Sequence, residues 1–316
     1  MLRGDDPTAP VTNSEPLLAL VGPTATGKTE AAVALAERLR AEIVSVDSML
    51  VYRGMDVGTA KPTSEQRTRV PHHLIDVADP SEAFSVARYQ AVALEAIGAI
   101  RARGHRVLLV GGSGLYFRAL VDRLELPGTD PGTRRELERE AAAVGAVRLH
   151  QRLAAADPAA AAKIEPSNVR RTVRALEVAT LSGRPFSSFA AAWERYDPAL
   201  VRVAGVTAPR GVLDERIRAR IRSMLERGLL DEVRSLVERG FGGWLTATQA
   251  IGYAELARHL AGEVSLEEAV EGTVRRTKAL ARRQLAWFRR DPRVRWFGIG
   301  EAGAIDALDR IVEHLS

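Results

Sequence analysis

The feature that most constrains this chain is a glycine-rich turn near its amino end. The turn spans residues 22–29 and fits the pattern G-x-x-x-x-G-K-[ST]; it reads Gly22, Pro23, Thr24, Ala25, Thr26, Gly27, Lys28, Thr29. It follows the apolar run 17–21 and opens a helical pattern that continues to about Arg40, which is the strand–loop–helix context of a phosphate-binding loop. Backbone N–H groups of such a loop hold phosphate oxygens, while Lys28 adds positive charge and Thr29 offers a hydroxyl to Mg²⁺. The pattern predicts a bound polyphosphate without identifying its carrier.

Further apolar runs predict the fold class. They cover residues 42–47, 73–77, 106–110 and 201–206, and helical patterns lie between several of them. Continuous apolar strands are buried on both faces, which is typical of a parallel sheet with helical crossovers. We therefore predict an α/β fold with a parallel-sheet core built around the phosphate loop.

The helical segments suggest how the chain is divided. Residues 127–199 are rich in Ala, Arg and Glu, contain no convincing strand, and are interrupted at Asp157-Pro158 and Glu165-Pro166. We predict a helical insertion there, a catalytic core formed by 17–126 and 200–316, and a solvated tail at 1–16. A second helical region runs from about Leu213 to Arg290, with a break at 240–243.

Composition excludes several classes of protein. The chain of 316 residues has no cysteine, so disulfides, iron–sulfur clusters and a cysteine nucleophile are excluded. No apolar run approaches the length of a membrane span and the amino end lacks a secretory signal, so we expect a cytoplasmic protein without a membrane partner. The formal net charge is only +5. Its distribution is therefore more informative than its size.

Asp47 ends the second predicted strand. The carboxyl ends of parallel strands form the ligand crevice of such folds, so this carboxylate is expected beside the phosphate loop. It could hold Mg²⁺ through water or accept a proton from an attacking nucleophile. It could also simply cap a turn. Asp76, which follows the apolar pair at 74–75, is a competing metal-site candidate.

A basic helix is predicted at 274–290. At 100° per residue its seven cations fall within about 160° of one another, and no acidic residue of the segment compensates them. They are Arg275, Arg276, Lys278, Arg282, Arg283, Arg289 and Arg290. Such a face suits nucleic-acid phosphates, although a solvated helix face without a partner is the alternative. Arg170, Arg171 and Arg174 form a smaller basic cluster in the insertion.

With these segments in view, the chain resembles the tRNA dimethylallyltransferase (isopentenyltransferase) family over about residues 17–290. The resemblance rests on the phosphate loop and on several blocks in the family's order. These blocks are residues 47–62, 111–116, 168–178, Arg216-Ile217 with Arg220, 250–253, and Arg283-Gln284 with 287–289. The family transfers an isoprenoid from dimethylallyl diphosphate to N6 of the adenine just 3′ of the anticodon.

The resemblance implies roles for particular residues. The phosphate loop would hold the diphosphate of the prenyl donor, with Mg²⁺ as cofactor. Asp47 would act as the base, Thr26 would lie beside the reacting groups, and Arg220 would lie near the diphosphate. Positions matching tRNA contacts include Asp47, Ser48, Met49, Leu50, Ser113, Arg134, Arg170, Arg171, Arg174, Gly252, Tyr253, Arg282 and Arg283. The helical insertion would flank the anticodon stem-loop, and we expect a monomer.

One departure and three alternatives remain open. Leu50 stands where the family usually has Gln, so a side-chain amide that could read the flipped base is missing. A small-molecule kinase could place ATP on the same loop and use Asp47 or Asp76 for Mg²⁺. Prenyl transfer to free adenine nucleotides would need no basic helix. An RNA-binding module would need neither Lys28 with Thr29 nor a carboxylate at the crevice.

Overall fold

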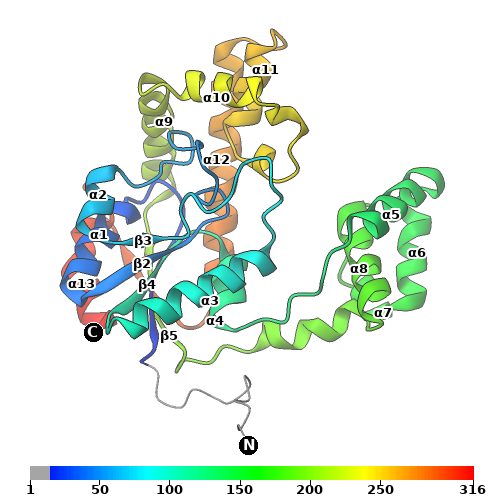
Figure 1. Cartoon of the computed structure of the whole chain (residues 1–316), viewed down its shortest axis with the longest axis horizontal. Helices are drawn as coiled ribbons and strands as arrows, with labels where there is room; N and C mark the ends of the chain where they lie inside the picture. Colours follow the sequence, from blue (N-terminus) through cyan, green and yellow to red (C-terminus); the bar gives the residue numbers. More distant parts are fainter. Residues whose placement is uncertain (1–14) are drawn as a thin grey trace, which may run out of the picture. The chain divides into compact units, whose positions relative to one another are not determined.

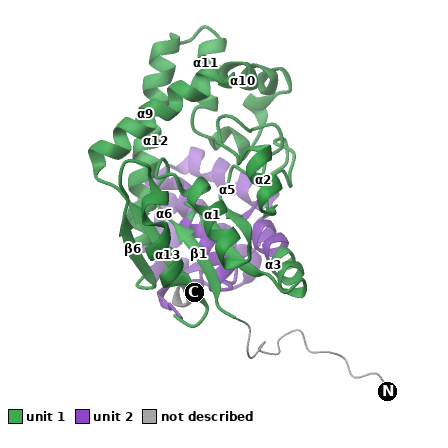
Figure 2. Ribbon diagram, turned by 90° about the vertical axis from the view of Figure 1, so that its left-hand side faces the viewer, with its two compact units in different colours: residues 1–83, 95–113, 198–316 green, residues 84–94, 114–197 purple. Residues whose placement is uncertain are grey.

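The structure is a computed structural model that describes residues 15–316, except for the side chains of 190–192. Most of the predicted tail, residues 1–14, lies outside the described residues. The described chain forms two compact units (Figure 2): residues up to 83 with 95–113 and 198–316, and residues 84–94 with 114–197. We call them the sheet unit and the helical unit and describe each by itself. Within the described range no helix is long and apolar enough to span a bilayer.

The sheet unit confirms the predicted parallel α/β core (Figure 1). Its six strands all pair in parallel, in the order β3-β2-β4-β1-β5-β6. Their bounds are β1 Leu17–Val21, β2 Ala41–Val46, β3 His72–His73, β4 Arg106–Gly111, β5 Val201–Thr207 and β6 Val294–Gly298. The carboxyl ends of β1, β2 and β4 therefore meet at one edge of the sheet.

Two strands differ from the sequence-based prediction. The strand expected at 73–77 is only the two-residue β3, because Leu74 and Asp76 adopt positive φ angles of 63° and 59° that end the extended chain. The Asp76 carboxylate is held by Lys61 and Arg67. Strand β6 was not predicted, because Arg295 interrupts its apolar residues; it pairs with β5 at the edge of the sheet.

Helices α1 (Lys28–Leu39) and α13 (Leu308–Leu315) pack on the sheet in one apolar cluster. The cluster joins Leu35 of α1 and Ile311 of α13 to Leu18, Leu20 and other strand residues. Two other helices, α2 (Ser64–Arg69) and α3 (Val86–Ala102), precede β3 and β4, and α3 runs through parts of both units. Burial of these apolar side chains fixes α1, and with it the phosphate loop, against the strand ends.

The carboxyl-terminal half of the sheet unit is helical, as predicted. Its main helices are α9 (Arg210–Glu226), α10 (Leu229–Glu238), α11 (Tyr253–Leu260) and α12 (Leu266–Phe288). Short 3₁₀ turns, η2 (Phe241–Gly243) and η3 (Ala247–Gln249), replace the regular helix at the predicted glycine break. Helix α12 ends at Phe288, two residues earlier than predicted, so Arg289 and Arg290 lie between its end and Asp291-Pro292. A last 3₁₀ turn, η4 (Ala304–Ala307), precedes α13.

The helical unit contains no strand among its described residues. Its elements are α4 (Gly114–Val121), α5 (Pro131–Val144), α6 (Ala146–Ala156), α7 (Pro158–Ala161), α8 (Val169–Ser182) and η1 (Phe186–Glu194). The break predicted at Asp157-Pro158 separates α6 from α7, where the buried Asp157 carboxylate caps α7 by accepting from the Ala160 N–H. Glu165-Pro166 lies in the turn before α8. The compact unit is larger than 127–199, since it also takes in 84–94 and 114–126.

Candidate active site

The phosphate loop has a conformation that only its own glycines allow. Gly22 has a φ of 146°, and a Cβ added there would collide with the Val206 carbonyl oxygen of β5. Gly27 has a φ of 75° at the start of α1. The backbone of Thr26 is also anchored, because its carbonyl accepts from the Ala304 N–H (2.9 Å). The loop is thus a rigid turn directed at the sheet edge.

Lys28 is folded back onto this loop. Its Nζ donates to the Pro23 carbonyl (2.5 Å) and to the Thr26 hydroxyl (3.3 Å), and it forms no ion pair within the described range. Burial and the neighbouring Arg220 lower the pKa of Lys28 to about 7, against the opposing effect of Asp47. A cation in this position lacks a partner of opposite charge, which a bound phosphate would supply.

The structure places Thr26 in the interior of the loop. Its side chain is fully buried, and its hydroxyl donates to the Pro23 carbonyl (2.9 Å). The role expected for Thr26 beside the reacting groups stays a prediction. In the structure its hydroxyl bond holds the turn closed.

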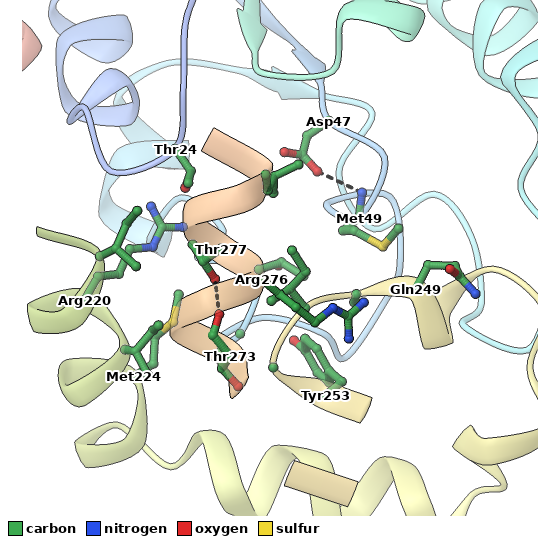
Figure 3. Close-up of a pocket in the computed structure, with 18 of the residues that line it drawn as sticks. Thr24, Asp47, Met49, Arg220, Met224, Gln249, Tyr253, Thr273, Arg276 and Thr277 are labelled. Carbon is green, nitrogen blue, oxygen red and sulfur yellow. Dashed lines mark hydrogen bonds between the residues drawn. The ribbon is translucent and has the colours of Figure 1, made fainter. Parts of the chain in front are cut away.

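Asp47 follows β2 directly and makes the capping bond that the sequence allowed, while its role as a base stays a prediction. Its Oδ1 accepts from the Met49 N–H (2.8 Å), so one carboxylate oxygen closes a turn. Figure 3 shows the rest of the carboxylate directed into the cavity. Ser113, another predicted contact, lies close by, because its N–H donates to the carbonyl of Val46 (3.2 Å). The capping bond therefore orients a carboxylate that still faces the cavity.

Two cavities adjoin at Asp47. The smaller, of about 120 Å³, lies along the phosphate loop, and the larger, of about 310 Å³, extends toward α9, α11 and α12. Five residues line both: Thr24, Asp47, Thr59, Arg220 and Gln284. Asp47 is the one acidic side chain lining either cavity in the described chain, so the electrostatic surroundings favour an anion. Burial lowers the pKa of Arg220, while the Asp47 charge opposes this shift and the Arg227 charge adds to it.

The larger cavity has a closed and an open side. On the closed side the lining is buried and largely apolar, with Ile217, Ile221, Met224 and Leu229 from α9 and α10. On the open side the side chains of Gln249, Arg276 and Arg283 are exposed. Figure 3 shows Met224 and Gln249 on opposite sides of this cavity. Gly252 and the buried Tyr253 also line it.

Glu232 of α10 fixes the cavity wall that carries Thr59. Its Oε2 accepts from the N–H groups of Asp56 and Val57 (both 2.8 Å). Its Oε1 accepts from the Gly58 N–H (3.1 Å) and the Tyr253 hydroxyl (2.6 Å). Burial, followed by the Glu232 charge, raises the pKa of Tyr253. One carboxylate thereby ties α10, α11 and the loop at 56–59 into a single wall.

Gln284 is a site residue that the sequence analysis did not single out. Its Oε1 accepts from the Thr24 N–H of the phosphate loop (2.9 Å). A Cβ at Gly112 would collide with its Nε2, and one at Gly111 would collide with the Val46 carbonyl. The sequence signal was the Arg283-Gln284 block, which places Gln284 on the face of α12 that meets the cavity. Two glycines after β4 thus leave room for an amide that supports the loop.

The side chains at 48–50 divide between the cavities. Ser48 and Met49 line the larger cavity, whereas Leu50 lines only the smaller one. The side-chain amide expected from a Gln at position 50 would therefore face the phosphate cavity. Gln249, on the open side of the larger cavity, supplies an amide there instead.

The basic helix is partly neutralised, which corrects the expectation that its charges lack compensation. Arg276 pairs with Glu255 of α11, and Lys278 pairs with Asp214 of α9 (3.0 Å). These acids come from other elements, so inspection of the segment 274–290 could not find them. Arg282 and Arg283 are exposed, and Arg283 lines the larger cavity.

Arginines of the helical unit also differ from the expected cluster. Arg174 donates to the carbonyls of Pro127 and Gly128 (2.7 and 2.9 Å) and to the fully buried Glu177 (2.8 Å). Arg134 donates to the same carboxylate (2.7 Å). Arg170 and Arg171 are exposed. The three arginines of α8 therefore divide into one that holds the fold and two that face solvent.

Comparison with known proteins identifies the family of this chain. The model of the IPP transferase family matches residues 50–291. This chain belongs to that family. The tRNA dimethylallyltransferase of Nocardioides sp. is 48% identical over 304 residues, covering 96% of this chain and 98% of that protein. The Streptomyces coelicolor protein of the same name is 52% identical over 287 residues, covering 90% and 91%.

A solved structure from the same family also matches this chain. The tRNA isopentenylpyrophosphate transferase of Bacillus halodurans superimposes with a TM-score of 0.68 at 44% identity, covering 95% of this chain and 94% of that one. The resemblance inferred from the sequence blocks is therefore confirmed, and with it a family of prenyl-transferring enzymes. The small-molecule kinase alternative loses its second metal candidate as well, since Asp76 is engaged by Lys61 and Arg67.

Proposed function

We propose that this protein transfers the dimethylallyl group of dimethylallyl diphosphate to N6 of the adenine just 3′ of the anticodon in tRNA. The observation that carries the proposal is the junction of two cavities at Asp47 and Arg220. The smaller cavity suits a diphosphate and the larger suits an isoprenoid together with a base. All their lining residues come from the sheet unit of one chain, so we propose that a monomer suffices.

The leaving diphosphate needs its growing negative charge stabilised. The phosphate loop, Lys28 and Arg220 line the smaller cavity and can stabilise this charge through loop N–H groups and two cations. Within 15–316 no three His, Asp or Glu side chains gather as a metal site. Mg²⁺ typically uses one or two protein oxygens together with substrate phosphates, and Thr29 and Asp47, which line this cavity, offer such oxygens. A bound Mg²⁺ would supply additional charge stabilisation on the diphosphate.

Asp47 is placed to accept the proton that the adenine must lose. As the bond between N6 and the allylic carbon forms, the bond from that carbon to the diphosphate oxygen breaks. The N6 proton passes to the Asp47 carboxylate, and the diphosphate leaves with the electron pair. The exocyclic amine of adenine is a weak nucleophile, because its lone pair is delocalised into the ring, so a positioned base contributes about 10²–10⁴-fold.

The open side of the larger cavity is the entrance for the base. Anticodon loops are single-stranded, so extruding one adenine costs only a few kcal/mol. Arg283 at this entrance and the exposed Arg282 of the same helix suit loop phosphates, and Arg170 and Arg171 of the helical unit offer further contacts. Gln249 is the candidate for reading the base edge.

The test is direct transfer. The purified protein is incubated with dimethylallyl diphosphate, Mg²⁺ and unmodified tRNA, and nuclease fragments of the anticodon loop are weighed. We expect the mass of one isoprene unit on the fragment containing the target adenine. A transcript with guanosine at that position is the matched control and should gain nothing. Modification of free adenosine monophosphate at a comparable rate would contradict the tRNA assignment.

A further inference from the structure

The closed side of the larger cavity is apolar even where its residues carry hydroxyl groups. Thr273 and Thr277 of α12 line it, but the Thr273 hydroxyl donates to the Ala269 carbonyl and the Thr277 hydroxyl to the Thr273 carbonyl (both 2.8 Å). Figure 3 shows the second of these bonds directed along the helix. The hydroxyl protons of Thr273 and Thr277 are therefore used within α12, so these threonines donate no hydrogen bond to a ligand that lies against Ile221 and Met224.

Met224 lies at the end of this apolar side. It follows Arg220 by four residues on α9, so the two side chains lie on the same helix face about one turn apart, about 6 Å along the axis. Figure 3 shows both beside the cavity, with Met224 farther than Arg220 from Asp47. Met224 is only 5% exposed, and its neighbour Leu229 at the start of α10 is 2% exposed. Both side chains are thus buried parts of the cavity wall.

The positions of Arg220, Asp47 and Met224 indicate where the diphosphate, the reacting carbon and the tail of the isoprenoid donor would lie. A diphosphate in the smaller cavity lies near Arg220, and the reacting carbon must lie at the junction beside Asp47. The tail then extends along the apolar side toward Met224, while the base occupies the open side. A cavity of about 310 Å³ lies at the low end of small-molecule sites, which span roughly 300–1,000 Å³, and it must hold both the base and the tail.

We propose that Met224 sets the length of the isoprenoid donor, admitting one isoprene unit beyond the diphosphate and excluding a second. The proposal rests on the proposed function, because it assigns the donor tail to the apolar side. A ten-carbon allylic diphosphate has the same reacting carbon and leaving group, so the same bonds form and break. It is excluded only because its second unit would overlap the Met224 side chain.

Shortening this side chain tests the proposal. Met224→Ala removes everything beyond Cβ, while Met224→Leu keeps nearly the same volume. Met55→Ala removes the same atoms from another buried position that lines neither cavity, and so controls for general destabilisation. Each protein is assayed with dimethylallyl diphosphate and with geranyl diphosphate on the same tRNA, and kcat/KM is measured for both donors.

We expect the ratio of geranyl to dimethylallyl transfer to rise about 10–200-fold in Met224→Ala, the range that pocket contacts of this size provide. Met224→Leu and Met55→Ala should keep the wild-type ratio. Should Met224→Ala melt below the assay temperature, the milder Met224→Val replaces it with the same expectation in direction. Competition of geranyl diphosphate against dimethylallyl diphosphate gives a binding readout that does not require turnover.

The results distinguish a failure of the proposed function from a failure of the length limit alone. Wild-type protein that transfers no isoprenoid to tRNA contradicts the proposed function itself. Wild-type protein that transfers dimethylallyl, together with a folded Met224→Ala whose donor ratio and competition stay within twofold of wild type, overturns the length limit alone. An equal rise in the ratio for Met55→Ala would also overturn it, because loosening rather than space would then be the cause.

Discussion

At the junction of the two cavities, Lys28 and Arg220 share a single acidic neighbour, Asp47, whereas in the helical unit Arg134 and Arg174 both contact the buried Glu177. The arginines of the helical unit hold α5, α8 and the segment at 127–128 together, and their charges are already neutralised. The cations at the junction outnumber their acid, so part of their charge is free for an anionic ligand. Arginine thus stabilises the fold of the helical unit through Glu177, whereas the proposed role of Arg220 at the junction is to bind the diphosphate.

The largest effect should follow from changing the single acid at the junction. Asp47→Asn retains an oxygen that can accept from the Met49 N–H, so the turn should persist while the base is lost. We expect kcat to fall about 10²–10⁴-fold with tRNA affinity nearly unchanged. Single-turnover rates and filter binding measure the two separately. Equal losses in both would show that Asp47 acts only through the fold.

Changing Glu177, the shared acid of the helical unit, should reduce stability, whereas changing Asp47 should reduce turnover. Glu177→Ala removes the buried carboxylate that Arg134 and Arg174 share, and since both arginines keep partial contact with solvent, we expect a loss of about 1–3 kcal/mol in the free energy of unfolding. Urea unfolding followed by circular dichroism gives this value. Hydrogen bonds from Arg134 and Arg174 outweigh burial and lower the pKa of Glu177. Its contribution should therefore be present above the ordinary Glu pKa and disappear as the pH falls below it. A variant as stable as the wild type would remove the contrast between the two regions.

Arg220→Gln removes a cation for which the described residues show no ion pair like those that Glu177 forms with Arg134 and Arg174. We expect kcat/KM for the donor to fall about 10²–10³-fold, the range for losing one preorganised donor to a developing negative charge. The unfolding free energy should stay the same or rise, since a half-buried charge is removed. Thermal unfolding and donor kinetics on the same preparation provide the check. A large loss of stability would place Arg220 with the arginines of the helical unit.

The pKa of Lys28 predicts a pH dependence of donor binding. In the free protein this pKa is about 7, and a bound diphosphate favours the protonated form, so binding above that pH must take up a proton. Donor affinity should consequently weaken by up to about tenfold for each pH unit above 7, until the pKa of the complex is reached. Calorimetry in buffers of different ionisation enthalpy measures the proton directly. Binding at pH 8 with no proton uptake would be incompatible with a neutral Lys28.

The lowered pKa of Lys28 also predicts how the free energy of unfolding changes with pH. Because the folded pKa of Lys28 lies below its unfolded value of 10.5, the unfolded chain binds more protons between those two values. The contribution of Lys28 to the unfolding free energy should then rise from pH 7 toward 10.5. Lys28→Met should flatten this part of the curve.

The smallest effect concerns the exposed cations of α12. Neutralising Arg282 should reduce the slope of log affinity for tRNA against log salt by about 0.7–0.9, the value for one phosphate contact. Neutralising the paired Lys278 should change this slope less, since Asp214 already compensates its charge. Salt titrations of both variants test the difference. Identical slopes for the two variants would show that the ion pair does not matter for RNA binding.

Much of the sheet and part of the site could be predicted from the sequence because they depend on local pattern. The apolar runs of β1, β2, β4 and β5 are continuous, and the phosphate loop and Asp47 follow strands directly. Strand β6 could not be predicted, because Arg295 interrupts its apolar run. Its partner strand, β5, lies about 90 residues earlier in the sequence.

The remaining site residues depend on contacts between distant segments. Gln284 meets Thr24 across 260 positions of sequence, and Glu232 meets the loop at 56–58 across about 175. No periodicity or spacing rule connects such pairs, because the helices that bring them together pack through apolar faces found elsewhere. The partners of Arg276 and Lys278 were missed for the same reason.

The crowding around Gly22, Gly111 and Gly112 has a consequence for inhibitor design. At each of these positions an added side chain would meet a backbone carbonyl or the Gln284 amide. A diphosphate mimic held by this turn would therefore be difficult to evade, since the simplest resistance mutations, those that obstruct the drug with a larger residue, would disrupt the enzyme's own architecture first. Escape would have to arise farther out, among residues whose bulk the protein can change without cost.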